Sequence, residues 1–240
     1  MKKYYYLLLI ILAIVPANQA NGQFFGSVVG NGKIVSENRD IRTTFTGIRV
    51  SSGIDIILAQ GNNQSVRVEA DENIIENIVT KVESGVLKVY FDRSINFTGN
   101  RKVYVTMKDI EQLSTSSAGD IIGNGLLRCD NLSLKATSAG DIKLELKAER
   151  IEVNISSSGD IDLMGECDIM EANLSSAGDL NATDLKTREV DITVNSAGDA
   201  TIYVTEKLEA RASSAGDIRY QGNPEYVNAY ASSAGSIRKR

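Results

Sequence analysis

One short motif returns along the chain at a nearly constant spacing. Ser117-Ala118-Gly119-Asp120-Ile121 is the first of seven copies, and Ser233-Ala234-Gly235-Ser236-Ile237 is the last. The glycines of successive copies lie 21, 19, 19, 20, 18 and 19 residues apart. A fixed period of this length is typical of a repeat architecture, in which each repeat is one structural unit. The chain is therefore expected to be a stack of short units.

Apolar and polar residues alternate inside each repeat. In one repeat Ile151, Val153 and Ile155 are apolar, whereas Glu152 and Asn154 between them are polar. The same offsets from the glycine carry apolar or small residues in every repeat. Because side chains alternate across a strand, one set is expected to point inward and the other to water.

The repeats predict an all-β fold, a right-handed parallel β-helix (β-solenoid) with coils of about 19–20 residues. A unit of this size cannot bury its own apolar face, but stacked units share a continuous core. The right-handed sense of the coil follows from the general rule that crossover connections between parallel strands are right-handed. A β-sandwich is the alternative, since it also has short strands at regular spacing. Neighbouring strands of a sandwich are antiparallel, so they do not require the same residue type at the same position of successive repeats. The observed pattern therefore favours the solenoid.

The first 22 residues have the features of a secretory signal peptide. Lys2 and Lys3 precede an apolar run at residues 4–15, and Ala20-Asn21-Gly22 supplies small residues for cleavage. Cleavage after Ala20 is the alternative. The mature chain is therefore expected in the periplasm, on the outer cell surface or in the medium. No later stretch is apolar enough to predict a membrane span.

The rest of the chain is expected to be a single domain that follows an irregular lead-in at residues 23–42. Within the domain at 43–240, residues 43–108 are expected to form irregular β-rich coils, and residues 109–240 regular ones. Asp71 to Val79 carries isoleucines at helical spacing, so one short helix with Asp71 as its N-cap is predicted there.

Each repeat is expected to turn a corner at its glycine, since glycine adopts positive φ without a Cβ clash. The serine two residues earlier is expected to face inward and to form a hydrogen-bonded ladder with the next coil. The corner glycines are Gly119, Gly140, Gly159, Gly178, Gly198, Gly216 and Gly235.

An aspartate follows the glycine in six of these corners: Asp120, Asp141, Asp160, Asp179, Asp199 and Asp217. Stacked coils would place neighbouring carboxylates about 5 Å apart. The favoured interpretation is that each carboxylate accepts backbone N–H bonds at its turn, with no bound cofactor. The alternative is a stripe that binds a hard cation such as Ca²⁺ through oxygen ligands. Asp55, which follows Gly53-Ile54, is expected to repeat the same turn chemistry in the first coil.

Composition argues against two function classes. The net charge is −5 and the basic residues are dispersed, so no patch for nucleic acid is expected. The chain has no histidine for general base catalysis and no tryptophan platform for sugars. A polysaccharide-cleaving β-helix is the enzyme alternative, but its site would need a unique constellation rather than repeated identical acids. The chain is therefore expected not to be an enzyme.

Two cysteines in an exported protein would ordinarily be expected to form a disulfide. Here Cys129 and Cys167 occupy the same column of the stack, with Ala148 in the coil between them. Two strand spacings are about 9–10 Å, whereas disulfide Cα atoms lie within about 7 Å. Two free, buried thiols are therefore predicted, with Thr187 and Thr205 continuing the column.

Five exposed tyrosines are candidates for a contact surface near the C-terminal end, since tyrosine is favoured at interfaces. Scattered tyrosines on an open sheet are the ordinary alternative. They are Tyr104, Tyr203, Tyr220, Tyr226 and Tyr230.

Several motifs together resemble one known family, the putative auto-transporter adhesin head domain, or GIN domain. They are Phe45-x-Gly47-Ile48-x-Val50, Gly53-Ile54-Asp55-Ile56, the run Val66-x-Val68-Glu69-Ala70-Asp71-Glu72-Asn73 and the serial Ser-Ala-Gly-Asp turns. The resemblance covers about residues 43–238. It implies a right-handed parallel β-helix on an exported bacterial protein with a role in adhesion, and it supplies no catalytic residues.

The expected function is therefore binding, by a rigid rod that presents polar ladders to a surface glycan or protein. A structural, self-associating component of a bacterial envelope assembly, and hence a homo-oligomer, is the alternative. Unpaired strand edges at an open solenoid end would support such stacking. Glycan binding by the isolated domain would favour the first function, and concentration-dependent dimers without it would favour the second.

Overall fold

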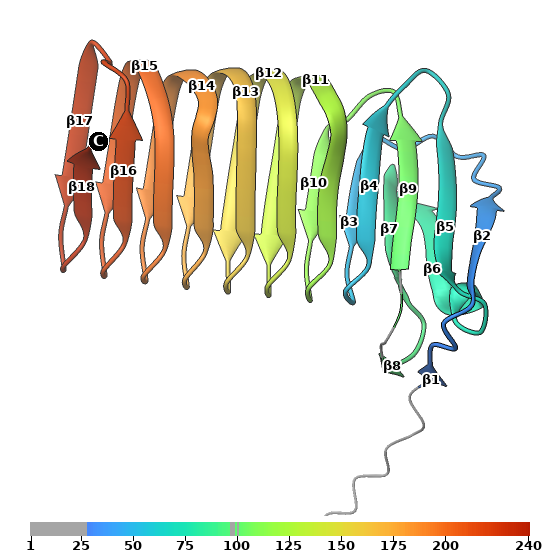
Figure 1. Cartoon of the computed structure of the whole chain (residues 1–240). Helices are drawn as coiled ribbons and strands as arrows, with labels where there is room; N and C mark the ends of the chain where they lie inside the picture. Colours follow the sequence, from blue (N-terminus) through green and yellow to red (C-terminus); the bar gives the residue numbers. More distant parts are fainter. Residues whose placement is uncertain (1–27, 97–98, 100) are drawn as a thin grey trace, which may run out of the picture.

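The computed structural model describes residues 28–96, 99 and 101–240, and it is a parallel β-solenoid of about seven turns. Its strands stack side by side along a rod, with tight turns along one edge and wider bends along the other (Figure 1). The solenoid predicted from the repeats is thus confirmed. The expected signal peptide lies outside the described residues, as does the first part of the lead-in.

Five strands each run through most of a coil. They pair in parallel with their neighbours in the order of the sequence. They are β11 (Asp120–Thr137), β12 (Asp141–Ser156), β13 (Asp160–Leu174), β14 (Asp179–Val194) and β15 (Asp199–Ala212). The last coils contain β16 (Asp217–Gln221), β17 (Tyr226–Ala231) and β18 (Ser236–Lys239).

The stack is in register, and like residues form the core. Leu132 pairs with Ile151, Ile151 with Met170 and Met170 with Val190. All four are buried. The inward columns predicted from the alternation are therefore correct, and they form one continuous core along the rod.

The first coil of the stack comes from an early part of the chain. It consists of β3 (Gly47–Val50) and β4 (Asp55–Gln60). These strands pair in parallel with β10 (Gln112–Thr115) and β11. The segment between β4 and β10 therefore leaves the stack after one coil and returns to it.

That segment, residues 61–111, closes the N-terminal end of the rod. Within it, β7 (Val86–Phe91) and β9 (Arg101–Met107) extend the two sheet faces in parallel beyond β3 and β4. Antiparallel strands then follow on both faces (Figure 1). They are β6 (Ile78–Glu83) beside β7, β5 (Ser65–Asp71) beside β9, and β2 (Ile34–Arg39) beside β5. A separate small pair joins β1 (Val28–Val29) to β8 (Ile95–Asn96).

The helix expected at residues 71–79 is wrong. Only a 3₁₀ turn, η1 (Ile75–Asn77), occurs there. Asp71 ends β5 instead of capping a helix, and β6 begins at Ile78 and pairs with β7. The isoleucine spacing also suits a turn that buries Ile74, Ile75 and Ile78 against the end of the core, and strand pairing takes over the rest.

The corner turns differ from the expectation in their backbone. Ser117 and Ala118 have φ values of 50° and 57°, and every later turn places its serine and the next residue in the same left-handed region. The glycine that follows is not among the residues with positive φ. Gly119 N–H donates to the Ser116 carbonyl at 3.1 Å. Two central residues with positive φ and this bond define a type I′ turn.

The corner glycine is required by the close approach of the neighbouring coil. A Cβ added to Gly159 would lie 2.7 Å from the carbonyl carbon of Ala136. At Gly216 it would lie 2.6 Å from the carbonyl oxygen of Val194. Real Cβ contacts are longer than this, so the close approach of the neighbouring coil, and not a positive φ, favours glycine at the corner.

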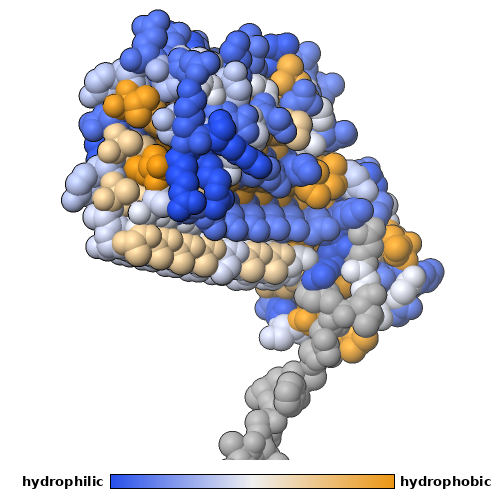
Figure 2. Space-filling model, turned by 60° about the vertical axis from the view of Figure 1, so that its left-hand side comes forward, coloured by the Kyte–Doolittle hydropathy of each residue, from blue (hydrophilic) through white to orange (hydrophobic). Residues whose placement is uncertain are grey.

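The corner serines are exposed rather than inward, because two left-handed residues turn the side chains toward solvent. Their backbone still forms a ladder. Ala118 N–H donates to the Ser138 carbonyl at 3.1 Å, and Ala139 N–H donates to the Ser157 carbonyl at 3.2 Å. The predicted ladder of inward serine hydroxyls is therefore a ladder of main-chain bonds, and the turns form straight rows along one edge of the rod (Figure 2).

Candidate functional site

The aspartates beside the corner turns form a single column. Asp141, Asp160, Asp179, Asp199 and Asp217 pair with one another on successive strands. Asp55 pairs with Asp120 and extends the column into the first coil. Asp141 N–H donates to Asp120 Oδ1 at 3.2 Å, which is the kind of turn bond predicted for these carboxylates.

The column is electrostatically uneven along its length. Burial raises the pKa of Asp160 above its ordinary value, and the neighbouring carboxylates of Asp141 and Asp162 raise it further. Burial likewise raises the pKa values of Asp120, Asp141 and Asp179.

Cationic groups lie at the two ends of the column. At the N-terminal end burial raises the pKa of Asp55, while Arg101 and Lys102 oppose that shift. At the other end Asp217 forms an ion pair with Arg219 and accepts a hydrogen bond from the Ser236 hydroxyl. The aspartates between the two ends thus carry most of the repulsion.

The column does not converge on a cation site. Across the described part of the chain, no three or more carboxylate, thiol or imidazole groups are placed to hold one metal ion. One carboxylate per strand in a straight row offers fewer ligands than the six to eight oxygens that Ca²⁺ prefers. Ca²⁺ binding by the column stays a prediction, and the turn role is the one its geometry supports.

A second feature lies on the opposite edge, where each coil makes its wider bend. Here two consecutive residues point outward between inward ones, as with Glu149 and Arg150 between Ala148 and Ile151. Two adjoining hollows of about 610 and 520 Å³ lie between the outward side chains. We call them the corner groove, and it is lined by residues 109–111, 128–133, 147–150, 152, 166–168, 186 and 188.

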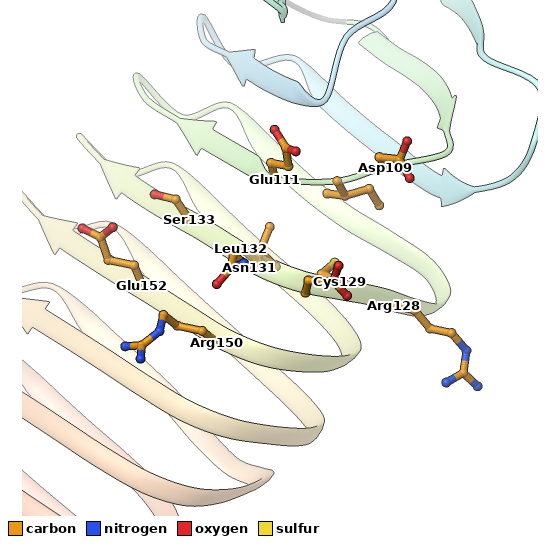
Figure 3. A pocket seen from close by; sticks show the side chains of 11 residues that line it. Asp109, Glu111, Arg128, Cys129, Asn131, Leu132, Ser133, Arg150 and Glu152 are labelled. Carbon is orange, nitrogen blue, oxygen red and sulfur yellow. The ribbon is translucent and has the colours of Figure 1, made fainter.

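The corner groove crosses successive coils. Figure 3 shows its first hollow, where Glu111, Ser133 and Glu152 come from three neighbouring levels of the stack. Arg128 and Cys129 line both hollows and join them. A ligand in the groove would therefore lie along the rod and contact several coils at once.

Small side chains form the floor of the groove. Cys129 pairs with Ala148, and Ala148 pairs with Cys167, so both cysteines are two strands apart as predicted. Both are free and buried. Thr187 continues the column, but its partner is Val204 because the pairing shifts after Thr187. The expectation for Thr205 is therefore wrong by one residue.

The floor is uncharged at neutral pH. Burial raises the pKa of the Cys129 thiol to about 11 and that of Cys167 to about 12. The Cys167 thiol also donates to the Ile169 carbonyl at 3.1 Å. Since the thiolate is the nucleophilic and metal-binding form, these cysteines act as small core residues.

The walls of the groove carry charges of both signs. Lys147 Nζ lies 3.0 Å from Glu166 Oε2 on the next strand. Arg188 donates through Nε to Glu206 at 2.9 Å and through Nη1 to Asp168 at 3.4 Å. Hydrogen bonding to Glu206 raises the pKa of Arg188, and hydrogen bonding to Lys147 lowers that of Glu166. The groove thus offers a fixed array of polar groups that suits hydrogen bonding to a polar ligand.

The corner groove is not among the features predicted from the sequence, although the sequence contains a signal for this groove. Several repeats carry two adjacent polar or charged residues between two inward positions, for example Asp130 and Asn131 after Cys129. A break in strict alternation marks a corner, and the small inward column beside it marks a hollow.

The five tyrosines do not form one surface. Tyr104 lies on β9 near the N-terminal end, with the Arg67 guanidinium 4.0 Å from its ring centre. Tyr203 and Tyr220 are half-buried, whereas Tyr226 and Tyr230 are exposed on β17. The expectation of a shared C-terminal location is wrong for Tyr104.

Known proteins with similar sequences or structures share this architecture. The sequence model of the family described as "Putative auto-transporter adhesin, head GIN domain" matches residues 44–224. None of the curated proteins compared with the chain matches it. Within the described residues, no helix has the length and hydropathy that a membrane span requires.

Three solved structures illustrate the similarity of fold. A putative adhesin from Bacteroides fragilis has a TM-score of 0.83 and 21% identity, and the match covers 89% of this chain and 100% of that one. A putative lipid binding protein from Parabacteroides distasonis has a TM-score of 0.72 and 23% identity, covering 90% and 100%. A putative adhesin from Parabacteroides merdae has a TM-score of 0.71 and 22% identity, covering 89% and 99%. Likeness at these identities concerns the fold.

Proposed function

The chain belongs to the putative auto-transporter adhesin, head GIN domain family, and from this premise we propose that it is an exported, non-catalytic binding module. Its corner groove is the proposed contact surface, and a glycan or protein on another surface is the proposed ligand. A family of this description implies export or surface display.

The observation that carries the proposal is the polar array along the groove. Cations and anions such as Lys147, Glu166 and Arg188 are held by ion pairs between strands. The strands that carry them pair in parallel with both neighbours over a buried core, so the backbone holds these groups in register. Fixed donors and acceptors lower the ordering cost of binding, which suits recognition of hydroxyl-rich or charged ligands.

The chemistry of the groove also favours binding over catalysis. Its thiols have raised pKa values and its carboxylates lie in ion pairs or face solvent. Nucleophilic catalysis needs a nucleophile within hydrogen-bond reach of a base. The open, charge-lined hollows suit a polar ligand better than an acyl chain, although one structural neighbour is named as a lipid binding protein.

A glycan array and a panel of purified bacterial envelope proteins, probed with the mature chain, would test this proposal. Arg128→Ala with Lys147→Ala removes two groove cations, and we expect at least tenfold weaker binding to any ligand found. Lys135→Ala, an outward cation that lies outside the groove, is the matched control. Binding that survives the groove double variant, or cleavage of the ligand, would contradict the proposal.

Self-association is the second candidate, because β17 pairs with β15 and with no other strand of the described chain. It predicts dimers whose fraction rises with protein concentration. Sedimentation velocity over a hundredfold concentration range would detect them, and a single monomeric species would exclude this candidate.

A further inference from the structure

The last coil exposes columns that are buried everywhere else in the stack. Val227 is 45% exposed, whereas its partner Leu208 on β15 is fully buried. All six residues of β17 are exposed. The apolar core between the two sheet faces is therefore exposed at this end of the rod. Apolar and strongly hydrophilic groups lie side by side there (Figure 2).

The two strand edges at this end are not equivalent. β18 carries Arg238 and Lys239 and is followed by Arg240. Lys239 pairs with Tyr220, which pairs with the buried Ile202, so a lysine stands at an inward position. Edge lysines and inward charges are known devices that block the addition of a further strand. The edge of β17 has no charged residue.

Main-chain groups of β17 are available on its free side. Ser232 N–H donates to the Ala212 carbonyl, so this residue faces β15. In a parallel strand the N–H and C=O groups of alternate residues point to opposite sides. Val227, Ala229 and Ala231 therefore direct theirs away from β15. Their small side chains leave room for residues of an added strand.

The charge around this edge is positive. Six basic residues and three acidic residues lie between positions 207 and 240, which gives +3 in a chain of net charge −5. Glu209 and Asp217 already form ion pairs with basic neighbours. A partner at this end is therefore expected to be acidic.

We propose that the free edge of β17 accepts an extended acidic segment of a partner protein as an added β-strand. Main-chain bonds to Val227, Ala229 and Ala231 would hold it, and the nearby basic residues would select its charge. A second copy of the chain fits less well. Its own end would bring the same basic residues, Arg238 and Arg240 among them, to the interface, and like charges that face each other destabilise a sheet. This inference concerns a different surface from the corner groove and stands independently of it.

The test uses fluorescence anisotropy with the mature chain and two labelled peptides. One alternates glutamate with valine, and the other alternates lysine with valine. We expect the acidic peptide to bind, the basic peptide not to bind, and added salt to weaken binding. Equal binding of both peptides, or of neither, would overturn the proposal, as would a concentration-dependent dimer that excludes the acidic peptide.

Two variants locate the contact. Ala229→Pro removes one free N–H without breaking a bond to β15, and we expect at least tenfold weaker binding. Ala229→Val keeps the N–H and is the matched control, with binding unchanged. Arg238→Glu with Arg240→Glu gives a second reading should the proline variant fail to fold, and we expect it to weaken binding of the acidic peptide at least tenfold. Unchanged binding of the acidic peptide by the charge-reversed variant would contradict the proposal. The groove variant Lys147→Ala is a further control and should bind the acidic peptide as the parent does.

Discussion

The regular coils and the segment between β4 and β10 extend the same two sheet faces by different means. In the coils every strand is parallel to its neighbours, and every corner has a serine two residues before its glycine. In residues 61–111 strands reverse direction, and a hairpin at Ser84 and Gly85 joins β6 to β7. Both regions use pairs of left-handed residues at their tight turns, but they use glycine differently.

Gly85 is itself left-handed, with φ of 77° and no atom within 4 Å of an added Cβ. Gly159 follows the left-handed pair and faces backbone of the preceding coil at 2.7–3.0 Å. Glycine is therefore needed for its backbone conformation in the hairpin, and for the close approach of a neighbouring strand in the stack.

The largest expected effect comes from adding one methyl group to each glycine. Gly159→Ala should lower the free energy of unfolding by about 3 kcal/mol, because backbone atoms cannot move aside easily. Gly85→Ala should cost about 1 kcal/mol, for its left-handed backbone alone. Urea unfolding followed by circular dichroism measures both. Equal losses would mean that the two glycines have the same role after all.

A smaller effect of opposite sign is expected one residue earlier in the corner. Ala177 has φ of 58°, a conformation that costs an alanine roughly 1–2 kcal/mol. Glycine relieves that cost and loses about 0.5–1 kcal/mol of chain entropy. Ala177→Gly should therefore stabilise the protein by about 0.5 kcal/mol in the same urea titration. Ala172→Gly, at a buried strand position, is the control and should destabilise it.

The smallest expected effect is a difference in how the melting temperature depends on pH, between a carboxylate of the coils and one of the hairpin. Asp160 has a raised pKa, so its ionised form opposes folding and the folded chain gains stability as the pH falls through that pKa. Asp160→Asn should raise the melting temperature at pH 7, by the equivalent of about 0.5 kcal/mol at most for an exposed carboxylate. The difference between variant and parent should shrink at pH 4.

Glu83 in the hairpin should respond in the opposite direction. Lys81 and Lys88 lower its pKa to about 2, so its stabilising effect is present above the ordinary pKa of 4.5 and is lost as the pH falls toward 2. Glu83→Gln should therefore lower the melting temperature at pH 7 and have no effect near pH 2. Identical pH profiles for the two variants would contradict the contrast between the regions.

The parallel stack was predictable because it depends on repeated local chemistry. Leu132, Ile151 and Met170 lie at one offset in successive repeats, and the same rule places Cys129 two strands from Cys167. The rule fails where the pairing register shifts, as between Thr187 and Glu189, because a one-residue shift in pairing leaves the composition unchanged.

The turn chemistry and the end of the rod were less predictable. Ser-Ala is not a typical left-handed pair, so the sequence points to the glycine, whereas the distance to the neighbouring coil is visible only in three dimensions. The isoleucines at 74, 75 and 78 suit either a helix or a closing turn, and pairing of β6 with β7 decides between them. The corner groove depends on which outward side chains meet across strands, which single-repeat patterns do not contain.

The return of the chain to its first coil has a consequence for the order of folding. Neighbouring regular coils meet at sequence separations of 17–21 residues, but Gly47 meets Gln112 and Asp55 meets Asp120 at a separation of 65 residues. Contacts between distant residues require a larger loop to close and slow the folding of a domain. We therefore expect the coils from β11 onward to assemble as a nearest-neighbour zipper, with β3 and β4 docking late. Hydrogen exchange during refolding should then protect β12 to β14 before β3.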